Sequence, residues 1–295
     1  MVSCIITTYN RTINILKRAI DSVLAQTYAE IELIVVNDCP ENKELANDIE
    51  QLVKTYLSSC KIPIQYIAHE KNSGACVARN TGINASTGEY IAFLDDDDEW
   101  MPQKIERMVG CIEKDSSIGM VYSQYIIRSD NDELLIKPPV YDSNWFVHLL
   151  GRNYIGSTSF PLIRKTSLIE AGMFDVKMRS MQDWDMWLRI AKCSSIAYCD
   201  VPLTLYHVEA ESITTNISKK KNGHDRMLEK YKDDYGRHRK QLSIRLGEAG
   251  YDLYKYGARR EGRQYIIKGI CTYPFQIEHL KIIKRVLKRR FLQKG

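Results

Sequence analysis

The sequence predicts an α/β protein with an open, mainly parallel sheet, followed by a smaller helical region. Over the first 114 residues, short β-branched apolar runs alternate with segments of helical periodicity. Such runs are typical of strands covered on both faces, and the alternation indicates a doubly wound sheet. The charge then changes: residues 1–217 carry 20 basic and 29 acidic side chains, and residues 218–295 carry 22 and 8. We therefore expect two domains, divided after residue 217.

The parallel part of the sheet is expected from four apolar runs at residues 2–7, 31–36, 63–68 and 89–94. Helices are predicted between and after them at residues 12–25, 41–59, 73–85 and 101–114. In the last helix, Pro102 occupies the first turn, where its missing N–H costs nothing.

The pattern is less regular after residue 114. Strands are expected at 118–127, 134–136 and 155–163, a helix at 182–193, and one or two strands at 195–207, interrupted at Pro202. Beyond residue 218 the chain reads as helical, with breaks at glycines and at Pro274.

Composition narrows the class of protein. No stretch approaches the roughly 20 apolar residues of a membrane-spanning helix, and the first residues lack the pattern of a signal peptide. The eight cysteines include no CxxC pair, and several lie in apolar runs as small hydrophobic residues do. A cytoplasmic location is expected.

Polar side chains follow three of the four predicted parallel strands, at residues 7–10, 37–38 and 95–99. In an open α/β sheet, ligands bind beyond the carboxyl ends of the strands. One polar strand end could simply cap a helix. Three ends on the same edge indicate a binding site.

The negative charge of the acidic run Asp95–Glu99 has to be compensated by a cation or by hydrogen-bond donors, because neighbouring carboxylates raise one another's pKa. It could be a solvated loop. Alternatively it binds Mg²⁺ or Mn²⁺, which prefer carboxylate oxygens and share their remaining positions with phosphates. An EF-hand is excluded, because Trp100 stands where that loop needs glycine. Dinucleotide and P-loop fingerprints are absent, and the first glycine is Gly74, which disfavours a triphosphate-binding loop.

An ordered set of motifs resembles the family 2 glycosyltransferases over roughly residues 1–215. The motifs are TTYNR (7–11), VNDCP (36–40), NSGACVARNTGI (72–83), GEYIAFLDDDDEWMP (88–102), GMFD (172–175) and QDWDMWLRIA (182–191). Their order is more specific than a single DxD triplet. The resemblance implies the GT-A fold and transfer of a sugar with inversion at its anomeric carbon.

The resemblance also implies site residues. The nucleotide-sugar positions are Thr7, Tyr9, Asp38, Arg79, Asp95 and Asp96. Asp38 would accept a hydrogen bond from the base, and Asp97 would ligate the divalent cation, Mn²⁺ or Mg²⁺, that bridges the diphosphate. Asp98 and Glu99 are expected to face solvent or to cap the following helix.

Asp183 matches the family's general base. Inversion requires a carboxylate that takes the proton of the acceptor hydroxyl, while the cation neutralises the leaving diphosphate. An ordinary charge at a helix N-terminus is the alternative for Asp183, and Asp185 is the competing base.

The chain departs from the family after the predicted last strand. A tyrosine–arginine–x–histidine pattern is common there, but this chain has Tyr206-His207-Val208-Glu209. His207 is our candidate for a further metal contact, with Glu209 as the alternative.

The C-terminal segment 279–295 contains seven basic residues and no acidic one. Leu280, Ile283, Leu287 and Phe291 fall on one face of a predicted helix. A basic amphipathic helix is typical of a membrane-surface or docking element, and the alternative is a helix packed on its own domain. The acidic N-terminal part does not support nucleic-acid binding.

These observations predict a metal-dependent inverting glycosyltransferase, transferring a hexosyl or N-acetylhexosaminyl group. The donor would be a nucleotide-diphosphate sugar, a UDP-sugar by preference, and the acceptor a glycan or lipid-linked saccharide at the inner membrane face. A sugar-phosphate nucleotidyltransferase and a non-catalytic nucleotide-sugar-binding module are the alternatives.

Overall fold

The computed structural model describes residues 1–129, 132–141, 143–208 and 217–292, with side chains to residue 289. The chain divides into two compact units. The sheet unit comprises residues 1–143, 155–176 and 189–209, and the helical unit comprises residues 144–154, 177–188 and 210–295. The boundary expected at residue 217 was based on the change in charge along the sequence. The contacts between residues in the structure also assign residues 144–154 and 177–188 to the helical unit.

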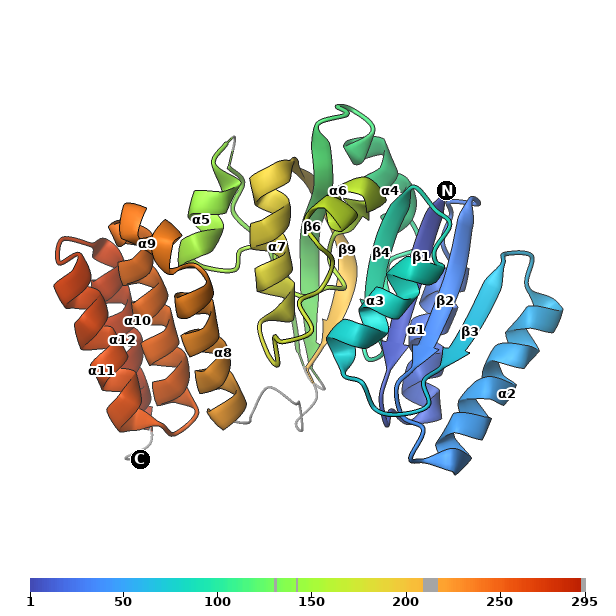
Figure 1. Ribbon diagram of the computed structural model, residues 1–295, viewed down its shortest axis with the longest axis horizontal. Coiled ribbons are helices and arrows are strands. Elements are labelled where there is room, and N and C mark those ends of the chain that lie inside the picture. Colours follow the sequence, from blue (N-terminus) through green and yellow to red (C-terminus); the bar gives the residue numbers. More distant parts are fainter. Residues whose placement is uncertain (130–131, 142, 209–216, 293–295) are drawn as a thin grey trace. The chain divides into compact units, whose positions relative to one another are not determined.

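The sheet unit contains a mixed sheet that has nine strands in the described residues (Figure 1). Four parallel strands lie in the order β3-β2-β1-β4: β1 (Val2–Thr8), β2 (Ile31–Asn37), β3 (Ile64–Ala68) and β4 (Tyr90–Asp95). The sheet continues through β8 (Leu162–Arg164), β6 (Ile118–Ser129), β9 (Ser195–His207) and β5 (Glu99–Trp100), and β7 (Asp132–Ile136) pairs with β6. Strand β9 runs parallel to β6, while β8 and β5 are antiparallel to their neighbours.

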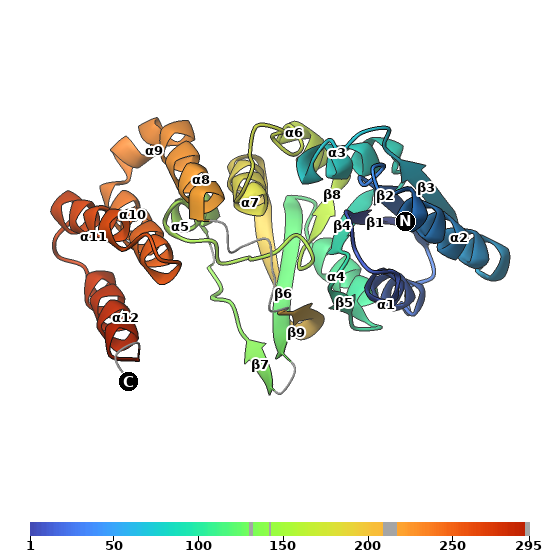
Figure 2. The same ribbon diagram turned by 90° about the horizontal axis from the view of Figure 1, so that it is seen from below.

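Helices cover both faces of this sheet. They are α1 (Ile13–Leu24), α2 (Lys43–Ser59), α3 (Ala75–Ala85), α4 (Lys104–Ile112) and α6 (Lys165–Glu170). Figure 2 shows α1 and α4 on the face opposite to α3. The predicted α/β class with helices on both faces is confirmed.

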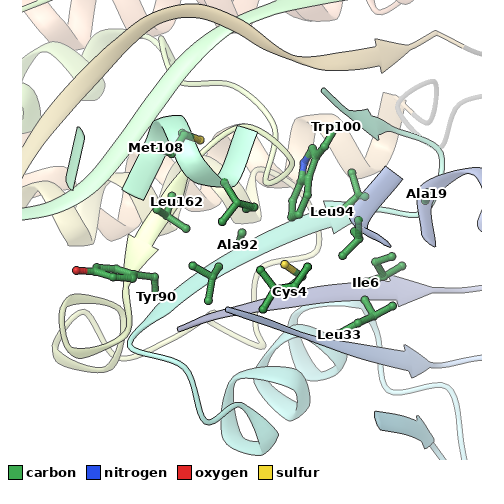
Figure 3. Close-up of a cluster of buried hydrophobic side chains, with 14 of the residues drawn as sticks. Cys4, Ile6, Ala19, Leu33, Tyr90, Ala92, Leu94, Trp100, Met108 and Leu162 are labelled. Atoms are coloured by element: carbon green, nitrogen blue, oxygen red, sulfur yellow. The ribbon is translucent and has the colours of Figure 1, made fainter. Parts of the chain in front are cut away.

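The main core lies between the sheet and helices α1, α2 and α4. Alternate residues of β1 point into it, so Cys4 and Ile6 pack with Leu33, Ala92 and Leu94 (Figure 3). Ile5 points to the other face, where a Cβ on Gly82 of α3 would come within 2.5 Å of its side chain. The glycine therefore lets α3 approach the sheet.

Two predicted strands differ from the structure. Of residues 155–163, only the last two belong to β8, because the preceding residues form a loop beside the end of β4. Strand β9 is not interrupted at Pro202. The proline pairs with Gln124 of β6 between register shifts, so an irregularity in the pairing accommodates its missing N–H.

The helical unit contains α5 (Trp145–Gly151), α8 (Ile217–Lys230), α9 (Lys232–Arg237), α10 (Arg239–Lys255), α11 (Arg259–Thr272) and α12 (Ile277–Leu292). It also contains the first residues of α7 (Gln182–Cys193). The backbones of helices α10 and α11 come into close contact at Gly250. A Cβ at this position would lie 2.5 Å from the Gly262 carbonyl oxygen, so the crossing has no room for a side chain. None of the helices in the described ranges is long and apolar enough to cross a bilayer.

Candidate functional site

The acidic run begins where β4 ends. Asp95 is the last residue of that strand and pairs in register with Thr7 of β1, which in turn pairs with Val36 of β2. The polar ends of three neighbouring strands therefore lie at one edge of the sheet, as the sequence predicted. Thr7 itself is half-buried there.

Asp95 sits in a cradle of hydrogen-bond donors. One carboxylate oxygen accepts from Arg79 at 2.8 Å and from the Thr158 hydroxyl at 2.9 Å, and the other accepts from the Ser157 hydroxyl at 2.8 Å. Burial opposes ionisation, but the Arg79 guanidinium and the hydroxyls hold the pKa of Asp95 below its ordinary value. Asp95 is therefore a fixed negative charge, and Arg79 is its ion-pair partner.

The loop that supplies these hydroxyls was missed by sequence reasoning. Residues 157–159 read Ser-Thr-Ser and follow Gly156, whose φ of +91° is left-handed. The Ser159 hydroxyl accepts the Asp95 N–H at 3.0 Å, and the Ser159 carbonyl accepts the Trp100 indole N–H at 3.0 Å. Three consecutive hydroxyl residues in a predicted buried strand were the signal that could have identified the loop.

Lys104 anchors the same loop from inside the protein. Its ammonium is fully buried and donates to the Phe160 carbonyl at 2.7 Å and to the Thr204 hydroxyl at 3.1 Å. Burial lowers the pKa of Lys104 to about 7. This lysine connects α4, the hydroxyl loop and β9 beneath the acidic run.

Arg11 binds the next two carboxylates. Its Nε lies 3.0 Å from Asp96, and its Nη2 lies 2.8 Å from Asp97. Burial and the neighbouring charges of Asp95 and Asp96 raise the pKa of Asp97 to about 6, and burial raises the pKa of Asp96. Arg11 stands in the TTYNR motif, but sequence reasoning gave it no role.

The expectation that Asp98 and Glu99 face solvent or cap the next helix is wrong. Asp98 is fully buried and accepts the His207 N–H at 3.2 Å, and burial raises its pKa well above the ordinary value. Glu99 lies in β5 and pairs with Arg18 at 3.3 Å. The reason is tertiary: β5 pairs with β9, which draws Glu99 into the sheet and brings Asp98 against the His207 N–H at the end of β9.

His207 ends β9 and lies against this part of the run. Its Nε2 is 2.6 Å from Glu99, and burial and the charge of Arg18 lower its pKa. Its partner in the structure is thus Glu99 rather than Asp97. Glu209, the alternative candidate, lies outside the described residues.

Asp38 organises the loop before α3. Its two carboxylate oxygens accept from His69 at 2.7 Å, from the Ser73 N–H at 2.8 Å and from the Gly74 N–H at 2.7 Å. It is 3 % exposed, whereas Tyr9 is 47 % exposed. The expected contact of Asp38 with a nucleotide base stays a prediction, alongside this structural role.

Asp183 belongs to the helical unit, in the first turn of α7, where Asn153 donates to its carboxylate at 3.1 Å. Asp185 is fully buried, with Lys230 at 2.6 Å and the Tyr231 hydroxyl at 3.0 Å. The competing carboxylate is therefore enclosed by its own ion pair. Trp184, between the two aspartates, is a core residue whose indole N–H donates to the Leu149 carbonyl at 2.6 Å.

A divalent cation fits the chemistry of the acidic run. No cluster of three metal-binding side chains occurs among the residues that the structure describes. Cations that bind phosphates commonly use only one or two carboxylates and complete their shell with the phosphates and water. Asp97 is 28 % exposed, and its pKa is raised first by burial and then by the charges of Asp95 and Asp96, which a cation would compensate.

Comparison with known proteins gives the family. Residues 3–172 match the model of glycosyl transferase family 2. A putative colanic acid biosynthesis glycosyl transferase, WcaA, of Escherichia coli is 29% identical over 250 residues, which are 83% of this chain and 86% of that protein. An uncharacterised glycosyltransferase of Rickettsia prowazekii is 30% identical over 257 residues, covering 82% and 73%.

Solved structures share the fold at low sequence identity. Staphylococcus aureus TarS in complex with UDP-GlcNAc has a TM-score of 0.59 and 14% identity, covering 91% of this chain and 88% of that one. GalNAc-T7 with UDP, GalNAc and Mn²⁺ has a TM-score of 0.62 and 15% identity, covering 94% and 57%. With this GT-A fold and the family match over more than half of its length, the chain belongs to glycosyl transferase family 2.

Proposed function

We propose that this protein transfers a sugar, with inversion, from a UDP-sugar to a hydroxyl of a glycan or lipid-linked saccharide. The observation that carries the proposal is the acidic run at the carboxyl edge of the sheet, with Asp95 ionised in its cradle and Asp97 partly open. The structural likeness to TarS bound to UDP-GlcNAc supports the donor class. The likeness to a colanic acid glycosyl transferase supports a role in polysaccharide synthesis.

The donor is assigned to the sheet unit. Thr7, Tyr9 and Asp38 are proposed to bind the base, and Asp95 the ribose, with Arg79 fixing its carboxylate. Asp96 and Asp97 are the residues that would hold Mn²⁺ or Mg²⁺. When bound, such a cation neutralises the charge that develops on the leaving diphosphate.

Asp183 is proposed as the general base that takes the proton of the acceptor hydroxyl. Asp185 is fully buried against Lys230 and Tyr231, which disfavours the competing carboxylate as the base. His207 remains a proposed further metal contact, although Glu99 holds it in the structure. The transferred group is proposed to be a hexosyl or N-acetylhexosaminyl residue.

The acceptor is proposed to be met in the cytoplasm, at the inner face of the membrane. The basic segment 279–295 supports this location, because basic juxtamembrane segments are attracted to anionic lipids. Nucleic acid is not a proposed partner.

The test separates binding from chemistry. A panel of nucleotide sugars, with and without Mn²⁺, is screened by thermal shift, since a bound ligand raises the melting temperature by mass action. With the best donor, Asp183→Asn should lower UDP release about 10²–10⁴-fold and leave the donor-induced shift intact. Asp48→Asn, an exposed position on α2, is the matched control.

Two results would contradict the proposal. UDP release at the wild-type rate in Asp183→Asn would remove the base assignment. Pyrophosphate formation from a nucleoside triphosphate and a sugar phosphate, with no UDP release from any nucleotide sugar, would identify a nucleotidyltransferase instead.

A further inference from the structure

The helical unit carries a strip of exposed apolar side chains around the start of α12. Phe275 is 95 % exposed, Ile277 68 % and Leu280 67 %, and Ile283 and Leu287 continue the row along the helix. We call these five residues the apolar strip. From Phe275 to Ile283 it lines one shallow hollow of about 500 Å³, together with Ile270 and Pro274. Apolar side chains gathered in this way mark interaction sites more often than isolated ones do.

The apolar strip is not the face with which α12 packs on its own unit. That face is formed by Ile282, which is 1 % exposed and lies beside Gly247 of α10, and by His279, which is 5 % exposed. The imidazole of His279 lies 3.0 Å from the Ser243 hydroxyl and 2.9 Å from the Tyr273 carbonyl. Helix α12 is thus held in place by one face and presents a second apolar face outward.

Basic side chains run beside the apolar strip. Lys281, Lys284, Arg285 and Lys288 are all exposed on α12. Lys284 and Lys288 are four residues apart and so lie on one side of the helix, next to Leu280 and Leu287. The only acidic residue of α12 is Glu278, in its first turn, and its carboxylate pairs with Lys281 at 2.9 Å. Arg285 pairs with Glu248 of α10 at 3.1 Å, so the net positive charge beside the strip comes from Lys284 and Lys288.

We propose that the apolar strip and its lysines dock on the surface of an anionic lipid bilayer. An interfacial helix places its apolar face at the boundary of headgroups and acyl chains, and the basic residues beside it bind anionic headgroups. Phe275, Ile277 and Leu280 supply the buried contact, while Lys284 and Lys288 supply the charge complementarity. A second copy of the chain is a poorer occupant, because an antiparallel two-fold pairing of α12 would place the two lysine rows on the same side of the interface.

This docking rests on the membrane location proposed above and identifies the surface that would provide it. It does not depend on the donor chemistry, so it can fail or succeed independently of glycosyl transfer. The full-length protein is sedimented with phosphatidylglycerol-containing vesicles and with neutral phosphatidylcholine vesicles. We expect binding to the anionic vesicles at low ionic strength, weak binding to the neutral ones, and release by salt, since salt screens the attraction.

Two variants test the two components of the surface. Lys284→Glu with Lys288→Glu should lower partitioning onto anionic vesicles at least about tenfold, because each basic residue at the surface contributes about 1 kcal/mol. Phe275→Ser with Leu280→Ser should lower it by a similar factor, through the lost apolar burial. Lys61→Glu with Lys114→Glu changes the net charge equally on exposed positions of the sheet unit, and should retain binding. Leu57→Ser, also exposed on the sheet unit, is the apolar control.

Each variant is compared at an unchanged melting temperature, which shows that it is folded. The proposal would be overturned if the wild type sedimented equally with anionic and with neutral vesicles. It would also be overturned if both surface variants bound anionic vesicles as well as the wild type does. An absence of vesicle binding together with a concentration-dependent dimer that Phe275→Ser dissociates would overturn it too, because the strip would then be an interface between copies.

Discussion

At the residue scale, the acidic run is held together largely by arginines. The repulsion among its carboxylates suggested a cation, yet Arg79 pairs with Asp95, Arg11 bridges Asp96 and Asp97, and Arg18 pairs with Glu99. The five acidic residues are thus not equivalent: Asp95 is kept ionised, whereas Asp97 and Asp98 have raised pKa values. Any cation at Asp97 has to share its carboxylate with Arg11.

This arrangement predicts how Arg11 affects metal binding. Arg11→Gln should bind Mn²⁺ about fivefold more tightly in the absence of nucleotide, because the guanidinium and the cation compete for the same carboxylates and a partly buried ion pair is worth about 1 kcal/mol. Electron paramagnetic resonance of free Mn²⁺ measures this affinity. Lys114→Gln, exposed and distant in sequence, is the control. Weaker Mn²⁺ binding by Arg11→Gln would show that the arginine positions the carboxylates rather than competing for them.

A second prediction at this scale concerns His224 of α8. This imidazole is 3 % exposed and lies 3.2 Å from Asp252, and burial with the charge of Arg245 lowers its pKa to about 4 from the ordinary 6.5. The unfolded chain therefore binds more protons than the folded one between these values. The stability that depends on a neutral His224 is complete above pH 6.5 and is lost as the pH falls towards 4.

The change should be measurable as a difference between two proteins. From pH 7 to about pH 4, wild type should lose about 2–3 kcal/mol more of its unfolding free energy than His224→Gln, which cannot take up the proton. Urea unfolding at several pH values measures it. Equal losses in both proteins would show that the imidazole takes up its proton equally in the folded and the unfolded chain.

At the element scale, small residues decide how closely helices approach. Gly250 of α10 and Gly262 of α11 face each other, and a Cβ on either would come within 2.6 Å of the other's carbonyl oxygen. No side chain fits this crossing without separating the two helices. The sequence shows glycines inside two helical patterns, which by helix propensity alone are unfavourable.

Gly250→Ala should therefore destabilise the helical unit, by about 1–3 kcal/mol, because the added methyl meets backbone that cannot move cheaply. Gly236→Ala in α9 is the matched control, since a Cβ there meets nothing within 4 Å. The control should be neutral or up to about 1 kcal/mol more stable, through helix propensity. Thermal and urea unfolding measure both, and equal stabilities would show that the α10–α11 contact is not tight in solution.

The strands show where the hydrophobic pattern of the sequence predicts an element and where it does not. Strands β1, β2, β3 and β4 begin and end within one residue of their predicted bounds, because each is a short apolar run; β1, β2 and β4 are buried along nearly their whole length, whereas β3 at the sheet edge is partly exposed. The two-residue strand β5 has too few residues for any period. It exists because its partner β9 is there to pair with it.

At the scale of the whole molecule, the proposed roles are distributed over two compact units. The acidic run, Arg79 and Asp38 belong to the sheet unit, and Asp183 belongs to the helical unit together with α12. For this reason we expect donor binding to survive Asp183→Asn and to survive the substitutions on α12. Binding, chemistry and membrane attachment should then be separable by single changes.

The amino-acid sequence by itself determined the α/β class, the polar strand ends on one sheet edge and the membership of family 2. Local information suffices for these, because strand burial gives a hydrophobic pattern and the chemistry of the site gives short ordered motifs. Only the tertiary structure decided which donors hold the acidic run, why Asp98 is buried and which face of α12 remains exposed. Hydroxyls at 157–159, arginines at 11 and 18 and the pairing of β5 with β9 are brought together from distant parts of the chain. Such contacts leave no period in the sequence, because they depend on packing between elements rather than on the residues within one.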